Sequence, residues 1–115
     1  MVVGSISEDE VDRLFRALAD ATRRDIVARV LVAEYSVSGL AELYDMSFAA
    51  VQKHVAVLER ASLVTKEKRG REQIVRGEMD GVQNARRLLD DYERIWRRRV
   101  DRITDILAED AEDEH

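Results

Sequence analysis

The chain has 115 residues, enough for one domain with a single core, and it carries 24 acidic against 19 basic side chains. Its content of 45% apolar and 37% charged residues excludes a disordered chain and a membrane-spanning one, and the opening MVVGSISEDE lacks the features of a secretory signal, so we expect a cytoplasmic protein. With no cysteine and only two histidines, the sequence excludes disulfides and thiolate metal sites and predicts neither a metal nor another cofactor.

Apolar spacing predicts four helices in the first half of the chain, over 8–19, 21–33, 37–43 and 48–61. Each span follows a polar side chain that can accept a hydrogen bond from the free N–H groups of a helix start. These predicted N-caps are Ser7, which forms a capping box with Glu10, and then Asp20, Ser36 and Ser47. The chain contains no proline, so nothing interrupts the helices from within.

The third and fourth predicted helices are joined by a few residues around 44–47, which is the layout of a helix-turn-helix. Val51, Val55 and Leu58 form one apolar stripe on the fourth helix, and we expect this stripe to face the core. The outward side then carries Ser47, Phe48, Ala49, Gln52, Lys53 and Ala56.

After Ser62 the pattern changes to β-prone residues at 63–65 and 74–75, with charged residues and a glycine between them. This predicts a two-stranded hairpin over 63–77 with its tip at 68–71. Apolar residues then return every three or four positions, which predicts one long helix over 81–108. The remaining residues, 109–115, include five acids and are expected to be a disordered tail.

Together these elements predict a mainly α fold of the α+β kind, with five helices and a two-stranded β hairpin. We assign residues 1–108 to one domain. The last helix would reach about 42 Å, whereas a chain of this size has a radius of gyration of about 13 Å, so we expect it to pair with a second copy. The predicted dimer contacts are Leu14, Leu88, Leu89, Tyr92, Ile95, Trp96, Val100 and Ile103.

Positive charge is concentrated on the predicted helix-turn-helix and hairpin, although the chain as a whole carries −5. Residues 47–76 hold seven basic and three acidic side chains, a net charge of +4, and the rest of the chain carries −9. A helix of this kind fits the DNA major groove while the hairpin reaches phosphates, and Gln52 can pair with adenine. The predicted DNA contacts are Ser47, Phe48, Ala49, Gln52, Lys53, His54, Lys68, Arg69 and Arg71.

Other interpretations of the same residues remain open. The fourth helix can be an amphipathic helix with a solvated outer face, and the hairpin cations can serve solubility alone. Arg23 and Arg24 oppose the dipole of the second helix, so we expect an intramolecular carboxylate or a phosphate beside them. No catalytic constellation is present in the sequence, and we predict that the protein is not an enzyme.

Three segments of the chain follow a known pattern. Residues 14–27, LFRALADATRRDIV, are similar to F-x-A-L-A-D-P-T-R-R-x-I-L, and residues 36–43, SVSGLAEL, are similar to S-V-G/S-E-L-A. Residues 47–64, SFAAVQKHVAVLERASLV, match S-x-x-A-V-S-x-H-L-x-V-L-x-x-A-G-L-V. In this order and spacing the segments resemble the ArsR/SmtB family of winged-helix transcriptional repressors, which implies an α+β winged-helix fold with the hairpin 63–77 as its β wing and a domain over 1–108 for DNA binding and dimerisation. The resemblance covers about residues 11–108 and implies a homodimer that binds a palindromic operator, usually as a repressor.

The chain also departs from the family pattern. Ser36-Val37-Ser38 stands where metal-sensing members carry Cys-x-Cys, and the last helix has no histidine. Residues 94–103, RIWRRRVDRI, are more similar to a metal-independent subgroup. Ser62 stands where the family has glycine. Two alternative functions remain: a dimeric protein-interaction module, antitoxin-like or anti-activator, and a sensor that holds a small organic effector between its dimer helices.

Overall fold

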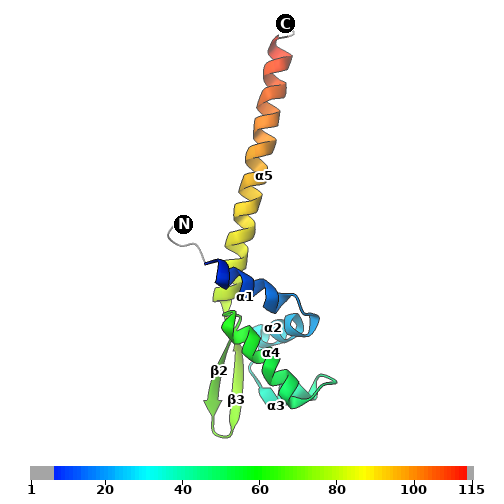
Figure 1. Cartoon of the computed structure of the whole chain (residues 1–115), viewed down its shortest axis with the longest axis vertical. Coiled ribbons are helices and arrows are strands. Elements are labelled where there is room, and N and C mark those ends of the chain that lie inside the picture. Colours follow the sequence, from blue (N-terminus) through cyan, green and yellow to red (C-terminus); the bar gives the residue numbers. More distant parts are fainter. Residues whose placement is uncertain (1–6, 114–115) are drawn as a thin grey trace. The chain divides into compact units, whose positions relative to one another are not determined.

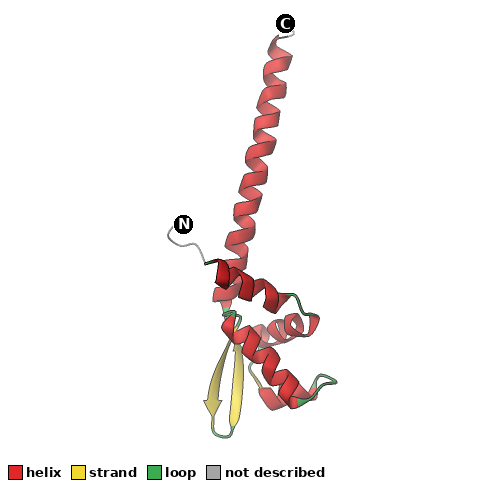
Figure 2. Cartoon of the chain, viewed as in Figure 1, coloured by secondary structure: helices red, strands yellow, loops and turns green. Residues whose placement is uncertain are grey.

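The computed structural model describes residues 7–113, and this part of the chain forms five helices and three strands (Figures 1 and 2). In chain order these are α1 (Glu8–Leu18), α2 (Ala21–Val32), β1 (Tyr35–Ser36), α3 (Val37–Glu42), α4 (Phe48–Arg60), β2 (Val64–Arg69), β3 (Glu72–Gly77) and α5 (Met79–Asp113). The predicted mainly α fold with a β hairpin and a long last helix is confirmed. The chain divides between Ala85 and Arg86 into two compact units, so α5 belongs to both.

Local capping sets where the first four helices begin. All four predicted N-cap side chains accept a backbone hydrogen bond of 2.9–3.1 Å, namely Ser7 from Glu10, Asp20 from Arg23, Ser36 from Gly39 and Ser47 from Ala50. Each bond satisfies one of the N–H groups that a helix start leaves free. The four predicted helix starts are therefore confirmed.

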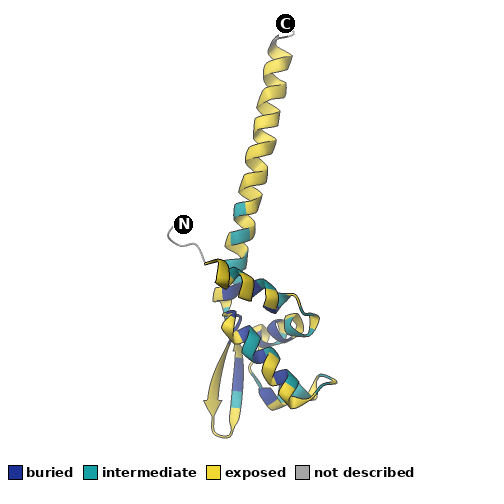
Figure 3. Cartoon of the chain, in the orientation of Figure 1, coloured by how far each residue is buried: buried dark blue, intermediate teal, exposed yellow. Residues whose placement is uncertain are grey.

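The core of the first unit lies between the helices and the sheet (Figure 3). Val51, Val55 and Leu58 are completely buried, which confirms the predicted stripe on α4. Further core residues from the other elements are Leu14, Ala17, Ile26, Val27, Val30, Val37, Leu40, Leu63, Val64 and Val75. Burying each of the larger side chains contributes about 1.5–3 kcal/mol, so this cluster is the main source of stability.

The sheet has three antiparallel strands in the order β1-β3-β2, one more than the sequence predicted. The additional strand β1 pairs Tyr35 with Val75 and Ser36 with Ile74. Two residues are too few to show an alternating pattern, so β1 could not be identified from sequence. The hairpin turn is shorter than predicted because only Gly70 and Arg71 separate β2 from β3. Gly70 has φ 65°, which suits the first position of a tight hairpin turn.

The end of α4 carries a strained residue. The N–H of Leu63 donates to the carbonyl of Leu58 at 3.0 Å, and the N–H of Ser62 donates to the carbonyl of Glu59 at 3.1 Å. This is the Schellman pattern, whose C′ residue adopts the left-handed conformation and is usually glycine. Here that residue is Ser62, with φ 58°.

We expect Ser62→Gly to raise the free energy of unfolding by up to about 1 kcal/mol, because relief of the left-handed strain exceeds the added entropy of the unfolded chain. Urea denaturation followed by circular dichroism measures the change. Ser62→Ala keeps the strain and serves as the control, so equal stabilities for the two variants would contradict the prediction.

Helix α5 is longer than the predicted span of 81–108. It begins at Met79 and continues to Asp113, so the segment 109–113, predicted to be part of a disordered tail, is helical. Alanine and glutamate favour helix, and the segment contains neither glycine nor proline, which explains the extension. Residues 114–115 of the predicted tail lie outside the described residues. No helix among the described residues has a stretch long and apolar enough to span a membrane.

Candidate nucleic-acid interface

The outward face of α4 carries most of the predicted DNA contacts. Ser47, Phe48, Ala49, Gln52 and Lys53 are all exposed, on the side away from the buried stripe. The side chain of Ser47 accepts the N-cap hydrogen bond, which leaves its hydroxyl hydrogen available to donate. In Figure 1 the start of α4 and the tip of the β2–β3 hairpin lie toward the same end of the first unit. The structure therefore brings these α4 residues and the hairpin tip to one end.

His54 differs from the other predicted contacts on α4. It follows Val51 by three positions and precedes Leu58 by four, so it lies beside the buried stripe, and it is half-buried. Its Nδ1 is 3.2 Å from Nη1 of Arg23. We therefore remove His54 from the predicted DNA contacts, because its half-buried ring faces the half-buried Arg23.

Arg23 and Arg24 bind main-chain carbonyls. Arg23 donates from Nε to the carbonyl of Ala17 and from Nη2 to that of Arg16, both at 2.8 Å. Arg24 donates from Nη1 to the carbonyl of Leu18 at 2.7 Å. These carbonyls form the negative end of the α1 dipole, so the two cations are favourably placed there. The expected intramolecular carboxylate is present beside Arg23 as well, because the Asp20 carboxylate interacts electrostatically with this arginine.

The cations of the hairpin fall into two groups. Arg69 lies 3.3 Å from Glu34 and 3.2 Å from Glu67, and Arg76 pairs with the same two carboxylates. The hydrogen bond from Arg69 lowers the pKa of Glu34, and the same bond raises the pKa of Arg69, so both stay ionised. All four side chains are about half exposed, so we assign no large stability to this network.

The second group consists of Lys68 and Arg71, whose positive charges are available for an external anion. Within residues 7–113, Lys68 and Arg71 have no carboxylate within ion-pair distance, and both are exposed at the hairpin tip. Lys66 lies 3.8 Å from Glu59 of α4. Of the three predicted hairpin contacts, Lys68 and Arg71 therefore fit the role better than Arg69.

The turn between α3 and α4 is held by a network that sequence reasoning missed. Tyr44 in this turn donates to Asp25 of α2, and Arg29 lies 2.9 Å from the same carboxylate. Desolvation, with the bond to Asp25, raises the pKa of Tyr44 to about 12, and the bond from Tyr44 lowers the pKa of Asp25. The network fixes the turn that precedes α4. Only the i,i+4 spacing of Asp25 and Arg29 was a sequence signal for it.

Helix α5 exposes an apolar stripe after Arg86. Among the predicted dimer contacts, Leu89, Tyr92, Ile95, Trp96, Val100 and Ile103 are exposed and Leu88 is half-buried. Ile106 and Leu107 extend this exposed stripe beyond the predicted set. Leu14 is corrected, since it is 2% exposed in the protomer core and has almost no surface to offer a second chain.

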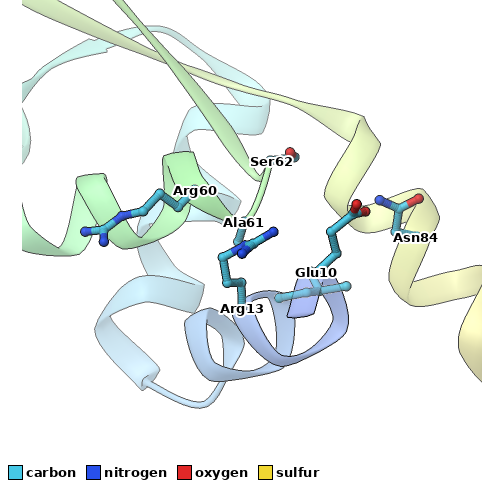
Figure 4. Close-up of a pocket in the computed structure, with 7 residues that line it drawn as sticks. Glu10, Arg13, Arg60, Ala61, Ser62 and Asn84 are labelled. Carbon is cyan, nitrogen blue, oxygen red and sulfur yellow. The ribbon is translucent and has the colours of Figure 1, made fainter. Parts of the chain in front are cut away.

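A polar cleft of about 290 Å³ lies between α1, the turn after α4 and the start of α5 (Figure 4). Its lining residues are Glu10, Arg13, Leu14, Arg60, Ala61, Ser62 and Asn84. Figure 4 shows Glu10 of α1 reaching toward Asn84 of α5. The cleft is largely polar and open, so it does not provide the enclosed apolar site typical of organic ligands. Among the described residues, no group of three acidic or histidine side chains is placed to hold a metal.

No family model matches the chain, but the proteins that it resembles in sequence and in structure are transcriptional regulators. HTH-type transcriptional regulator Rv2034 of Mycobacterium tuberculosis is 31% identical over 102 residues, which cover 89% of this chain and 92% of the relative. An ArsR-like transcriptional regulator from Rhodococcus sp. RHA1 is 33% identical, with a TM-score of 0.78 over 92% of this chain and 95% of that one. Neither is named as an enzyme.

The fold is also shared with a more distant solved structure. The homodimeric winged helix-turn-helix DNA-binding domain of Mb0332 from Mycobacterium bovis is 21% identical, with a TM-score of 0.58. The match covers 82% of this chain and 89% of that domain. These similarities support the assignment of α3 and α4 as a helix-turn-helix and of β2 and β3 as its wing.

Proposed function

Because the chain belongs to the ArsR family of winged helix-turn-helix transcriptional regulators, we propose that it binds a palindromic DNA operator as a homodimer and represses transcription in the cytoplasm, without a bound metal. The observation that carries this proposal is the placement of positive charge. Residues 47–76 hold a net +4 in a chain of −5, and they form α4 and the wing. Phosphate neutralisation by such a surface supplies most of the affinity of DNA-binding proteins.

Each part of this surface has a distinct role in the proposal. Helix α4 enters the major groove, where Gln52 donates to and accepts from one adenine and Ala49 permits close approach. Lys53 beside them contacts a phosphate. Lys68 and Arg71 at the wing tip contact phosphates of the adjacent backbone.

The proposed dimer forms through α5. Its exposed side chains include Tyr92 and Trp96, which are 58% and 61% exposed and are typical anchors of protein interfaces. A stripe of this size is unusual on a monomeric surface. Two-fold pairing would place two copies of α4 in successive major grooves about 34 Å apart, which predicts an operator with two inverted half-sites.

The test begins with selection of bound duplexes from genomic DNA and continues with Gln52→Ala. We expect this variant to lose about 1–3 kcal/mol of discrimination at one base pair of each half-site while non-specific affinity is kept. Fluorescence anisotropy with single-base operator variants measures the change.

Lys53→Ala is the matched control, because it should weaken binding to all duplexes equally. If Gln52→Ala discriminates between operator variants as the wild type does, Gln52 does not read a base. If the wild type selects no duplex while remaining folded and dimeric, the chain is better described as a protein-interaction module.

A further inference from the structure

The guanidinium of Arg23 connects the end of α1 to the middle of α4. Its Nε and Nη2 donate to the carbonyls of Ala17 and Arg16, and its Nη1 lies 3.2 Å from Nδ1 of His54. The backbone N–H of Arg23 donates in turn to the Asp20 carboxylate at 2.9 Å. The Arg23 guanidinium therefore contacts α1 through Nε and Nη2 and contacts α4 through Nη1.

This contact determines which ring nitrogen of His54 carries the proton. A guanidinium has only donors, so Nδ1 of His54 must be the acceptor and must carry no proton. The remaining ring proton then lies on Nε2, and the ring is neutral. A protonated ring would present a second cation to Arg23, and the bond would be lost. The Asp20 carboxylate interacts electrostatically with both Arg23 and His54.

Because of where His54 lies on α4, its bond to Arg23 can affect the orientation of the DNA-facing side chains. The ring lies at the edge of the buried stripe, whereas Gln52 and Lys53, two positions and one position earlier, point outward. The Tyr44–Asp25 bond holds the turn before α4, and the Arg23–His54 bond adds a polar contact at the middle of the helix. A small rotation of α4 about its axis would displace the outward side chains most. A bidentate contact from Gln52 to a base does not tolerate such a displacement.

We propose that Arg23 is a positioning residue for DNA recognition, which acts through neutral His54 to set the rotation of α4. The proposal rests on the proposed function and adds a residue that does not itself touch DNA. It also gives the imidazole of His54 a role different from the direct DNA contact that the sequence predicted.

The test compares His54→Leu with His54→Asn for specific and non-specific duplexes. The Oδ1 atom of asparagine lies near the position of Nδ1 and can accept from Arg23, so His54→Asn should keep operator affinity within about threefold. His54→Leu should lose about tenfold in operator affinity, the effect of one hydrogen bond to a charged group, with little change for random duplex. Equal operator affinities for His54→Leu and the wild type would overturn the proposal.

Arg23→Ala should show the same selective loss, and the double variant with His54→Leu should lose no more than either single variant. Arg24→Ala is the matched control, since it removes a bond to an α1 carbonyl without touching α4. If Arg24→Ala loses as much operator affinity as Arg23→Ala, the α1 bonds alone explain the effect and the proposal fails.

One further readout separates positioning from a general loss of stability. Nitrogen-15 NMR should show the Nε2–H tautomer in the wild type and a mixture in Arg23→Ala. A wild-type ring that carries its proton on Nδ1 would contradict the proposal. A wild type that binds no duplex would instead overturn the proposed function itself.

Discussion

Trp96→Asp is expected to convert the protein to a monomer and to lower its operator affinity by at least about a hundredfold. The residue lies within the exposed apolar stripe of α5 and is 61% exposed in the single chain. A carboxylate buried at the proposed interface would lose its hydration without gaining a partner, which costs several kcal/mol. The loss in DNA binding follows because two linked sites bind far more tightly than one.

Sedimentation velocity at micromolar concentration measures the oligomeric state. Ala108→Asp is the matched control, because it adds the same charge to α5 about a third of a turn away from Trp96 around the helix and should leave the dimer intact. A Trp96→Asp protein that sediments as a dimer would place the interface elsewhere.

Gly81→Ala is expected to reduce the free energy of unfolding by about 3 kcal/mol, the upper range for forcing an extra methyl into a packed site. A Cβ at this position would lie 2.6 Å from the carbonyl oxygen of Ala61 and 2.8 Å from that of Ser62. These carbonyls belong to the turn that ends α4, and the N–H of Gly81 donates to one of them at 2.8 Å. Neither side can move without breaking that turn.

Chemical denaturation of the purified variant measures this change. Gly39→Ala provides the comparison, since a Cβ there meets only the Ser36 hydroxyl at 3.1 Å and alanine favours helix. We expect Gly39→Ala to stay within about 1 kcal/mol of the wild type. If Gly81→Ala costs no more than Gly39→Ala, the close approach of α5 to the end of α4 does not constrain the fold.

Features that depend on neighbouring residues could be predicted from the sequence. The N-caps formed by Ser36 and Ser47 act over three residues, and the stripe of Val51, Val55 and Leu58 repeats with the helix period. The same local logic located the hairpin and the exposed face of α4. Together these predictions cover most of the fold and the outline of the candidate DNA surface.

Features that depend on partners distant in sequence could not be predicted. Arg69 pairs with Glu34, Tyr44 with Asp25, and Arg23 with His54, at separations of 35, 19 and 31 residues. Nothing in the sequence linked the two members of any of these pairs. This is why Arg69 and His54 were grouped with the DNA contacts, although one is paired with carboxylates and the other lies against Arg23.

If the cations of the wing and of α4 bind DNA phosphates, duplex affinity must depend strongly on salt concentration. Titration of the wild type with duplex at several salt concentrations should give a steep fall of log affinity against log salt. Arg71→Ala removes one cation from each protomer of the proposed dimer, so the slope should become shallower by about 1.8. Arg98→Ala on α5 should leave it unchanged. A folded, dimeric wild type with no duplex affinity at low salt would show that the protein does not bind DNA, and an Arg71→Ala slope equal to that of the wild type would show that the wing binds no phosphate.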